Sequence, residues 1–292
     1  MSVKKTILVT GVTGQQGNAA ARQLLKKGFS VKGLVRDKNK DTARAIEKLG
    51  VQLVEGNLEN KDSLKRALDG IDGVFSVTAA ALAVPKEQEV EQGINIAELS
   101  KQAGVNHFVF TSSLGASQPT GVPFLESKRE IEKHIRESGL PYTILQPTAF
   151  MENFKNMWLQ GDRIYAPFNP NLELMMISVR DIGEFASIAF ERPKEFLGKT
   201  LPLAVDIQPL SQIAKSFSRV LGRRIHFEPQ PIEEVKRFSE PLARMYERYN
   251  QGAAFAPIGQ ADLEMLRKIN PHFWTLEEWI KHTYETHAST PA

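Results

Sequence analysis

Three glycines at three-residue spacing follow a short apolar run near the start of the chain. Gly11, Gly14 and Gly17 come directly after an Ile-Leu-Val run, and a helical pattern of alanines and leucines follows them. In a strand–loop–helix unit, such glycines permit a sharp turn, close approach of the backbone to a pyrophosphate, and tight helix packing. The free N–H groups and the dipole at the start of the helix then favour phosphate. The pattern predicts a dinucleotide site; an ordinary strand–loop–helix turn is the alternative.

The residue that ends the second predicted strand (29–35) indicates which dinucleotide would bind. Arg36 stands about 20 residues past the glycine loop, where the adenosine ribose is expected. An acidic residue there would bind both ribose hydroxyls and favour NAD, whereas an arginine holds a 2′-phosphate and favours NADP. Lys38 and Lys40 follow Arg36. We expect NADP; Asp37 leaves NAD as an alternative, and a solvated basic loop is another.

Polar and small residues end three further predicted strands, 51–54, 73–77 and 108–110. The segments after these strands are Gly56-Asn57-Leu58, Thr78-Ala79-Ala80 and Thr111-Ser112-Ser113. Asn57 carries a donor and an acceptor for an adenine edge, and a plain turn residue is the equal alternative. Alternating strands and helices predict an α/β fold with a doubly wound parallel sheet, whose ligands gather at the carboxyl ends of the strands.

A lysine stands four residues after a phenylalanine at the start of the helix predicted over 127–137. Phe124 and Lys128 share one helix face if the helix begins that early. Short-chain dehydrogenases resemble this segment but carry tyrosine and lysine at that spacing. There the lysine holds the nicotinamide ribose and lowers the tyrosine pKa, so that the phenol moves a proton. Phe124 has no proton to give.

Composition narrows the class of protein. The 292 residues are 41% hydrophobic and 24% charged, with net charge +3 and no cysteine, which excludes disulfides and thiolate metal sites. No apolar run approaches the ~20 residues of a membrane span, and no signal peptide is expected, so we predict a cytoplasmic protein. Neither the mild charge nor the Arg223-Arg224 pair indicates nucleic-acid binding. The six histidines show no metal-ligand spacing, so no metal site is expected.

Ordered motifs along nearly the whole chain resemble the NmrA-like branch of the atypical short-chain dehydrogenases/reductases. The matching segments are VTGVTGQQG (9–17), LVRD (34–37), VEGNLENKDSL (54–64), GVFSVT (73–78), KEQEVEQG (86–93), FVFTSS (108–113), FLESK (124–128), QPTAFMENF (146–154), VRDIGEFASIAF (179–190) and INPHFWTLEEWIKH (269–282). The resemblance implies a Rossmann-type NAD(P)-binding domain over 1–153. It also implies a smaller mixed α/β C-terminal domain over 154–292 for substrate or partner, some of whose segments return to the first domain.

The resemblance also implies which residues contact the cofactor. They are Gly11, Thr13, Gly14, Gln15, Gln16 and Gly17 at the phosphates, Arg36 and Lys40 at the 2′-phosphate, Asn57 and Leu58 at adenine, Thr78, Ala79 and Ala80 along the path to the nicotinamide, Lys128 at its ribose, and Phe150, Met151, Glu152 and Asn153 near its ring. Relatives often have aspartate where Asn57 stands. Two alternatives stay open: Phe150 in the core, and Lys128 paired with Glu132 along its helix.

Two functions are compatible with this resemblance. Similar enzymes without the tyrosine, the isoflavone and phenylcoumaran ether reductases, rely on the lysine to handle the proton. The first hypothesis is therefore a reductase that passes hydride from NADPH to a small carbonyl, enone or quinone, with Lys128 and Ser113 (or Ser112) as catalytic residues. Ser113 would donate to the developing oxyanion, and capping of its loop is the alternative. The second is a non-catalytic NADP(H) sensor acting through a protein partner. Phe124 favours the sensor and Lys128 the enzyme; the oligomeric state is left open.

In the second half of the chain, single capping residues and charge patterns predict where helices begin. Asp181 is predicted to be the N-cap of a helix over 182–190, and Thr275 the N-cap of the last helix. The charged stretch 233–249 is predicted to be helical.

Overall fold

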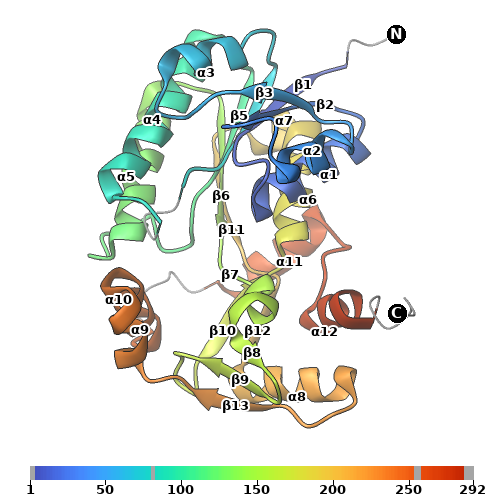
Figure 1. The fold of residues 1–292 in the computed structure, drawn as a ribbon, viewed down its shortest axis with the longest axis vertical. Helices are drawn as coiled ribbons and strands as arrows, with labels where there is room; N and C mark the ends of the chain where they lie inside the picture. The colour runs from blue at the N-terminus through green and yellow to red at the C-terminus, as the bar shows by residue number, and fades with distance from the viewer. Residues whose placement is uncertain (1–3, 80–82, 253–257, 286–292) are drawn as a thin grey trace. The chain divides into compact units, whose positions relative to one another are not determined.

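A seven-stranded sheet organises the first part of the chain (Figure 1). The computed structural model describes residues 4–79, 83–252 and 258–285. The strands lie in the order β11-β6-β5-β4-β1-β2-β3; their bounds are β1 (Thr6–Val9), β2 (Ser30–Val35), β3 (Gln52–Glu55), β4 (Gly73–Ser76), β5 (His107–Thr111), β6 (Tyr142–Pro147) and β11 (Lys199–Leu203). β1 pairs in parallel with β2 on one side and with β4 on the other. The strand order reverses there, and ligands of such sheets bind at the carboxyl ends of the strands beside this switch point.

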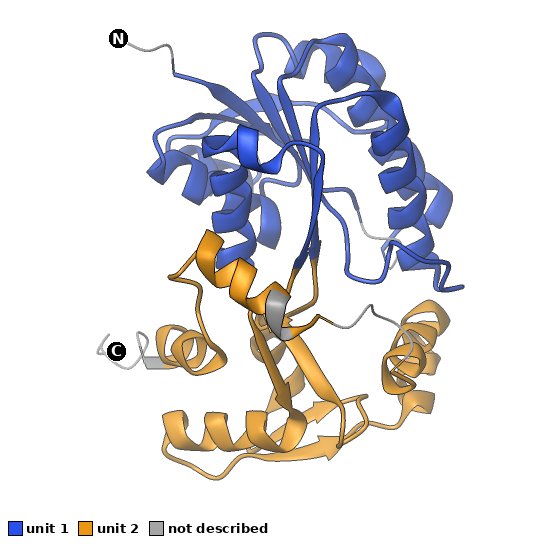
Figure 2. Ribbon diagram, turned by 180° about the vertical axis from the view of Figure 1, so that it is seen from behind, with its two compact units in different colours: residues 1–146, 179–202 blue, residues 147–178, 203–292 orange. Residues whose placement is uncertain are grey.

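Helices cover both faces of this sheet, and the predicted doubly wound α/β fold is confirmed. Their bounds are α1 (Gln15–Lys26), α2 (Asp41–Glu47), α3 (Lys61–Ala67), α4 (Lys86–Gln102), α5 (Pro123–Ser138), α6 (Val179–Glu191) and α7 (Pro193–Phe196). α4 and α5 pack together on one face, and α1 and α6 on the other (Figures 1 and 2). The backbones of α1 and α6 approach each other closely at Gly183. A Cβ on this glycine would lie only 2.6 Å from the carbonyl carbon of Ala19.

The chain divides into two compact units, coloured separately in Figure 2. Unit 1 comprises residues 1–146 and 179–202, and unit 2 comprises 147–178 and 203–292. The first segment of unit 1 thus ends at Gln146, whereas the first domain was predicted to extend to residue 153, and the segment carrying α6 and α7 returns to unit 1 after a first passage through unit 2.

Unit 2 contains two small sheets of mixed direction with helices beside them. The strands form the orders β12-β10-β7 and β13-β9-β8; their bounds are β7 (Ala149–Phe150), β8 (Leu159–Gln160), β9 (Arg163–Ala166), β10 (Glu173–Ile177), β12 (Asp206–Pro209) and β13 (His226–Pro229). The helical elements are the π-helical turns η1 (Phe154–Trp158) and η2 (Lys281–Glu285), and the helices α8 (Leu210–Leu221), α9 (Ile232–Phe238), α10 (Glu240–Asn250), α11 (Gln260–Ile269) and α12 (Leu276–Ile280). Among the helices within the described ranges, none is long and apolar enough to cross a membrane.

The first residues of the helices can be compared with the predicted N-caps. Thr275 caps α12, with its own N–H 2.8 Å from a Glu278 carboxylate oxygen, so that prediction is confirmed. The N-cap role of Asp181 is wrong: α6 begins earlier, at Val179, and the buried Asp181 carboxylate accepts from Arg180 inside the first turn. The stretch 233–249 is helical, as predicted, and divides into two helices because Ser239 leaves the helical conformation and caps α10.

A buried histidine at the start of β5 makes stability depend on pH. Burial, and to a smaller extent the charge of Lys5, lower the pKa of His107 to about 4. Because this lies below the unfolded value of about 6.5, the native state excludes the charged ring. The contribution of the neutral His107 ring to the free energy of unfolding is therefore fully present above pH ~6.5. This contribution, roughly 2–3 kcal/mol, is lost as the pH falls toward 4.

We expect urea unfolding at pH 7 and pH 4.5 to show this contribution. The unfolding free energy of the wild type should fall by about 2 kcal/mol more than that of His107→Gln, whose side chain carries no proton in this range. Equal losses in the two proteins would contradict the assignment.

Candidate functional site

The glycine loop shapes the carboxyl end of β1. Gly11 has a positive φ of 57°, a conformation that residues with a side chain rarely adopt. A Cβ on Gly17 would lie 2.2 Å from the Gly11 carbonyl oxygen, so only glycine lets α1 begin directly against the end of the strand. The turning and packing roles predicted for these two glycines are confirmed.

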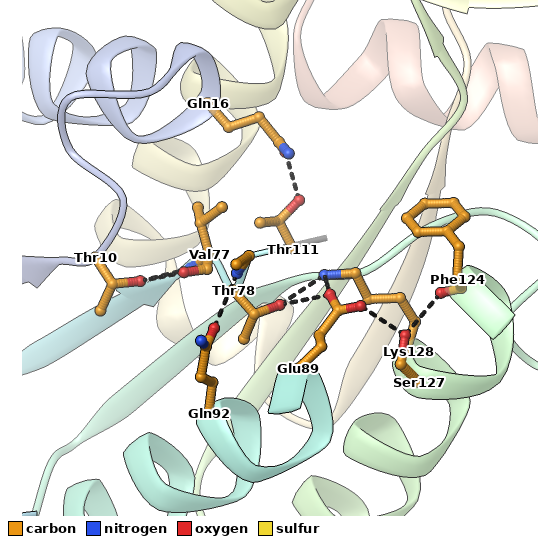
Figure 3. A network of polar contacts seen from close by, with 11 residues as sticks. Thr10, Gln16, Val77, Thr78, Glu89, Gln92, Thr111, Phe124, Ser127 and Lys128 are labelled. Carbon is orange, nitrogen blue, oxygen red and sulfur yellow. Dashed lines mark hydrogen bonds and ion pairs between the residues drawn. The ribbon is translucent and has the colours of Figure 1, made fainter. Parts of the chain in front are cut away.

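The start of α1 suits an anion. Within the described residues, α1 has neither a side-chain cap nor an acidic residue in its first turn. Its first N–H groups lack intrahelical acceptors, and the helix dipole is positive at this end. The side chain of Gln16 is engaged elsewhere: its amide oxygen accepts from the Thr111 hydroxyl at 2.6 Å, which ties α1 to the end of β5 (Figure 3).

Thr10 holds the ends of β1 and β4 together. Its hydroxyl donates to the Val77 carbonyl oxygen and accepts from the Val77 N–H, both at 2.7 Å (Figure 3). The residues that follow β4 are thereby placed beside the glycine loop.

A cavity of about 480 Å³ lies at this edge of the sheet, within unit 1. Residues from the glycine loop and from the ends of β2, β3 and β4 line it, and eight predicted cofactor contacts are among them: Gly11, Thr13, Gly14, Arg36, Asn57, Leu58, Thr78 and Ala79. Five other predicted contacts in unit 1 are not in this lining: Gln15, Gln16, Gly17, Lys40 and Lys128. Ala80 lies outside the described residues.

A second cavity, of about 680 Å³, adjoins the first and is basic. It shares Arg36, Gly56 and Asn57 with the first cavity. Among its lining residues the charged ones are Arg36, Lys38, Arg66 and Glu55, which gives three cations to one carboxylate. The predicted contact Lys40 is exposed at the N-cap of α2 and is not in the lining. Arg66 was missed, because nothing local distinguishes it from a solvated residue of α3.

Asn57 is a turn residue that also lines both cavities. Its side-chain oxygen accepts from the Glu59 N–H at 3.2 Å, and its own N–H donates to the Ser63 hydroxyl at 3.0 Å. The turn alternative is therefore realised in the structure, while the adenine contact stays a prediction.

Glu59 connects the end of β3 to α4 in the wall of the first cavity. One of its carboxylate oxygens accepts from Gln88 at 2.6 Å and from Gln92 at 2.8 Å. These bonds, and less strongly the charge of Arg36, hold the pKa of this exposed carboxyl below its usual value. The Gln92 side-chain oxygen accepts in turn from the Ala79 N–H at 3.1 Å. Sequence reasoning missed all three side chains in this wall.

A buried polar cluster lies next to the first cavity; we call it the Lys128 centre and define it as Thr78, Glu89, Ser127 and Lys128. Lys128 Nζ lies 2.8 Å from both Thr78 Oγ1 and Glu89 Oε1. Thr78 donates to Glu89 Oε1 at 2.8 Å, and Ser127 donates to Glu89 Oε2 at 2.6 Å (Figure 3). Glu89 and Ser127 are wholly buried, and Lys128 is 5% exposed. A carboxylate and a hydroxyl thus hold the Lys128 side chain inside the protein.

α5 explains how Lys128 reaches this position. The helix begins at Pro123, so Phe124 and Lys128 do lie on it one turn apart. The alternative pairing of Lys128 with Glu132 is wrong: the Glu132 carboxylate binds Arg136 at 2.6 Å and Gln146 at 2.7 Å. The Lys128 ammonium also lies over the Phe110 ring, 5.2 Å from its centroid.

The serines after β5 are buried. The Ser113 hydroxyl donates to the neighbouring Leu114 carbonyl at 3.3 Å, which fits the loop-capping alternative. Within the described part of the chain, the buried Ser112 hydroxyl has no hydrogen-bond partner. A catalytic role for Ser113 stays a prediction.

The four residues predicted near the nicotinamide ring belong to unit 2. Phe150 is half-buried in β7, and Met151 is fully buried with its N–H bonded to the Ile177 carbonyl. Glu152 accepts from the Trp279 ring N–H at 3.0 Å, and Asn153 precedes η1. Their contact with a cofactor stays a prediction.

Comparison with known proteins supports the motif assignment. The NmrA-like family model matches residues 3–280. The chain is 32% identical to an NAD(P)H azoreductase of Xenophilus azovorans, over 79% of each chain. It is 30% identical to the (4-alkanoyl-5-oxo-2,5-dihydrofuran-3-yl)methyl phosphate reductase of Streptomyces griseus, over 85% of this chain and 88% of that one.

A solved structure shares the fold across nearly the whole length of the chain. The crystal structure of NmrA, a negative transcriptional regulator, in complex with NADP superposes with a TM-score of 0.81 at 22% identity, covering 97% of this chain and 96% of that one. With the glycine loop, the switch-point cavity and the family match in agreement, the chain belongs to the NmrA-like family.

Proposed function

We propose that unit 1 binds NADP(H) in the cavity at the switch point. The observation that carries this proposal is the lining of that cavity, which unites the glycine loop, Arg36, and the residues after β3 and β4. The uncapped start of α1 suits the pyrophosphate, and the adjoining basic cavity suits a 2′-phosphate. The residues present therefore fit a phosphorylated dinucleotide.

We further propose that the chain is an NADPH-dependent reductase of a small carbonyl, enone or quinone. A bound NADPH supplies a hydride ion. Beside the cavity, the Lys128 centre supplies a buried lysine that would hold the nicotinamide ribose and assist protonation of the reduced substrate. Two relatives at 30% identity or more are a reductase and an azoreductase by name, which favours chemistry over binding alone.

A specific observation supports a second candidate, an NADP(H) sensor that acts through a protein partner. Phe124 contributes only its carbonyl oxygen to the polar network, accepting from Ser127 at 2.9 Å. The Lys128 ammonium is engaged by Glu89 and Thr78. No phenol therefore stands at this position to give a proton during turnover.

Oxidation of NADPH, followed by its absorbance, decides between the two candidates. The assay uses a panel of quinones and enones with the wild-type protein. Acceleration above background by any member supports the reductase. If the protein binds NADPH tightly but no member of the panel accelerates its oxidation, the result supports the sensor and contradicts the reductase.

Replacing Arg36 tests the choice of cofactor. We expect Arg36→Ala to raise the NADPH dissociation constant at least tenfold, because a charge-assisted hydrogen bond contributes about 1.5–3 kcal/mol. The NADH dissociation constant should change less than about twofold, since NADH lacks the 2′-phosphate. Arg44→Ala is the matched control: Arg44 is exposed on α2 and lies outside both linings, so its removal should have a smaller effect. Equal losses for both cofactors would contradict the NADP assignment.

A further inference from the structure

A buried polar network holds Gln146 near the end of β6. The side-chain nitrogen of Gln146 donates to a Glu132 carboxylate oxygen at 2.7 Å and to the Ser117 hydroxyl oxygen at 2.9 Å. Glu132 is wholly buried, and its other carboxylate oxygen accepts from Arg136 at 2.6 Å. Gln146 itself is 4% exposed. α5 and the loop after β5 therefore hold this amide group from two sides.

The chemistry of these partners fixes the orientation of the amide. A carboxylate can only accept hydrogen bonds, so the group that faces Glu132 must be the NH2 group of Gln146. Its two hydrogen atoms go to Glu132 and Ser117, and none is left. Within the described part of the chain, the Gln146 oxygen accepts no hydrogen bond, and it is not among the buried side-chain atoms that lack a partner. This oxygen is therefore an accessible acceptor with a fixed direction.

Gln146 stands at the edge of the sheet where ligands of this fold bind. β5 and β6 pair in parallel with Phe110 beside Ile144, and both side chains pack in the core with residues of α4 and α5. The pairing continues to Ser112, whose N–H donates to the Leu145 carbonyl at 2.7 Å. Because side chains alternate along a strand, Ser112 and Gln146 leave the same face of the sheet as that first pair. The buried Ser112 hydroxyl has no partner among the described residues, so this edge has hydrogen-bonding capacity that they leave unused.

An acceptor with a fixed direction selects a donor. A ligand hydroxyl can donate to the Gln146 oxygen, whereas a carbonyl or ether oxygen would place two acceptors against each other. Such a site discriminates against an analogue that lacks the hydroxyl, because the protein group is then left unpaired. Glu132 follows Lys128 by one turn of α5, so both side chains leave the same face of this helix. The acceptor therefore lies on the side of the sheet that carries the Lys128 centre.

We propose that Gln146 is a specificity-determining residue, whose side-chain oxygen accepts a hydrogen bond from a hydroxyl group on the substrate. Glu132 is the positioning residue that keeps this oxygen turned toward the ligand. The inference rests on the proposed reductase function and narrows its substrate class to carbonyl, enone or quinone compounds that carry a hydroxyl group.

Three forms of one naphthoquinone test the acceptor, with a methyl, a hydroxymethyl or a methoxymethyl group at the same ring position. Calorimetry in the presence of NADP⁺ measures their dissociation constants, and NADPH oxidation measures KM and kcat. We expect the wild type to bind the hydroxymethyl form about fivefold more tightly than either other form, which is the effect of one neutral hydrogen bond. The difference should appear in the dissociation constant and in KM, with kcat changed less than about twofold.

Gln146→Met removes the acceptor with little change in side-chain length. The hydroxymethyl form should then bind no more tightly than the methyl form. Gln102→Met is the matched control, because Gln102 is exposed at the end of α4, and this variant should keep the difference seen in the wild type.

Glu132→Gln tests the positioning role by a reversal that a structural defect would not produce. Arg136 can only donate, so it keeps the oxygen of the new amide on its own side and turns the new NH2 group toward Gln146. The Gln146 amide must then turn over and present its own NH2 group to the ligand. We expect the methoxymethyl form, whose ether oxygen can only accept, to bind this variant at least as tightly as it binds the wild type. The hydroxymethyl form should lose its advantage.

Each outcome decides one part of the inference. A wild type that binds the three forms equally, or binds none of them, overturns it, and so does a Gln146→Met protein that keeps the fivefold difference. An unchanged preference in Glu132→Gln overturns the positioning role of Glu132. A wild type that prefers the hydroxymethyl form but oxidises NADPH with no quinone or enone overturns the proposed reductase and leaves Gln146 as a ligand-binding residue.

Discussion

Gly17→Ala is expected to lower the free energy of unfolding by roughly 3 kcal/mol or more. The added Cβ would lie 2.2 Å from the Gly11 carbonyl oxygen, 2.5 Å from the Gly11 carbonyl carbon and 2.8 Å from the Thr10 carbonyl oxygen. These are backbone atoms, so no flexible side chain can move aside. The start of α1 would have to shift away from β1, although Ala20, Ala21 and Leu24 of that helix are completely buried.

Gly14→Ala provides the matched control for this change. The Cβ there would be 3.3 Å from the same Gly11 oxygen, and the residue has an ordinary φ of −90°. Its cost should be about 1 kcal/mol or less. Urea unfolding of the two variants and the wild type at neutral pH measures both effects; equal losses would show that the close approach of α1 to β1 is not the cause.

Glu89→Ala is the second substitution with a large expected effect, about 3–5 kcal/mol of lost stability. It removes the carboxylate that pairs with Lys128 and leaves the ammonium buried over the Phe110 ring. Replacing both partners by apolar residues of similar size, Glu89→Leu with Lys128→Met, should cost far less, because neither charge then remains inside the protein.

An exposed ion pair on α5, the helix that carries Lys128, is the control for Glu89→Ala. Lys133 and Glu137 of α5 lie 3.9 Å apart with side chains 73% and 67% exposed, so Glu137→Ala should change stability by no more than about 0.5 kcal/mol. Denaturant unfolding gives all the values. A double variant as unstable as Glu89→Ala would mean that lost packing, not the unpaired charge, governs the effect.

Local patterns were sufficient to predict the sheet and much of the cavity. Gly11, Arg36 and Thr78 each follow a short apolar strand, and the carboxyl ends of parallel strands meet at one edge. Strand–turn–helix periodicity therefore brings them together without knowledge of any long-range contact. The start of α5 was predicted too late, at residue 127, whereas the helix begins at Pro123, a residue that fits the first turn of a helix.

The partner of Lys128 could not be predicted from its own helix. Pairing along α5 indicated Glu132, yet the carboxylate comes from Glu89 on α4, and side-chain pairing between helices follows no local rule. One signal was present. Glu89 lies at helical spacing from the buried Gly93, Ile96 and Ala97 of α4, and a carboxylate on such a core-facing stripe requires a buried partner.

Local sequence patterns also could not predict the helix and unit boundaries that depend on long-range packing. The polar Asp181 resembled a helix start, but the helix begins at Val179, which is itself buried in unit 1. The return of residues 179–202 to unit 1 leaves no mark in composition, because their burial depends on α1 and on the edge of the sheet.

This return has a consequence for synthesis on the ribosome. Residues 147–178 of unit 2 are translated before α6 and β11, the last parts of unit 1. Until α6 emerges, the face of α1 that receives Gly183 stays uncovered in the nascent chain. Unit 1 therefore cannot finish folding co-translationally before residue 202 has left the exit tunnel, and a chaperone that shields apolar surface would act during that interval.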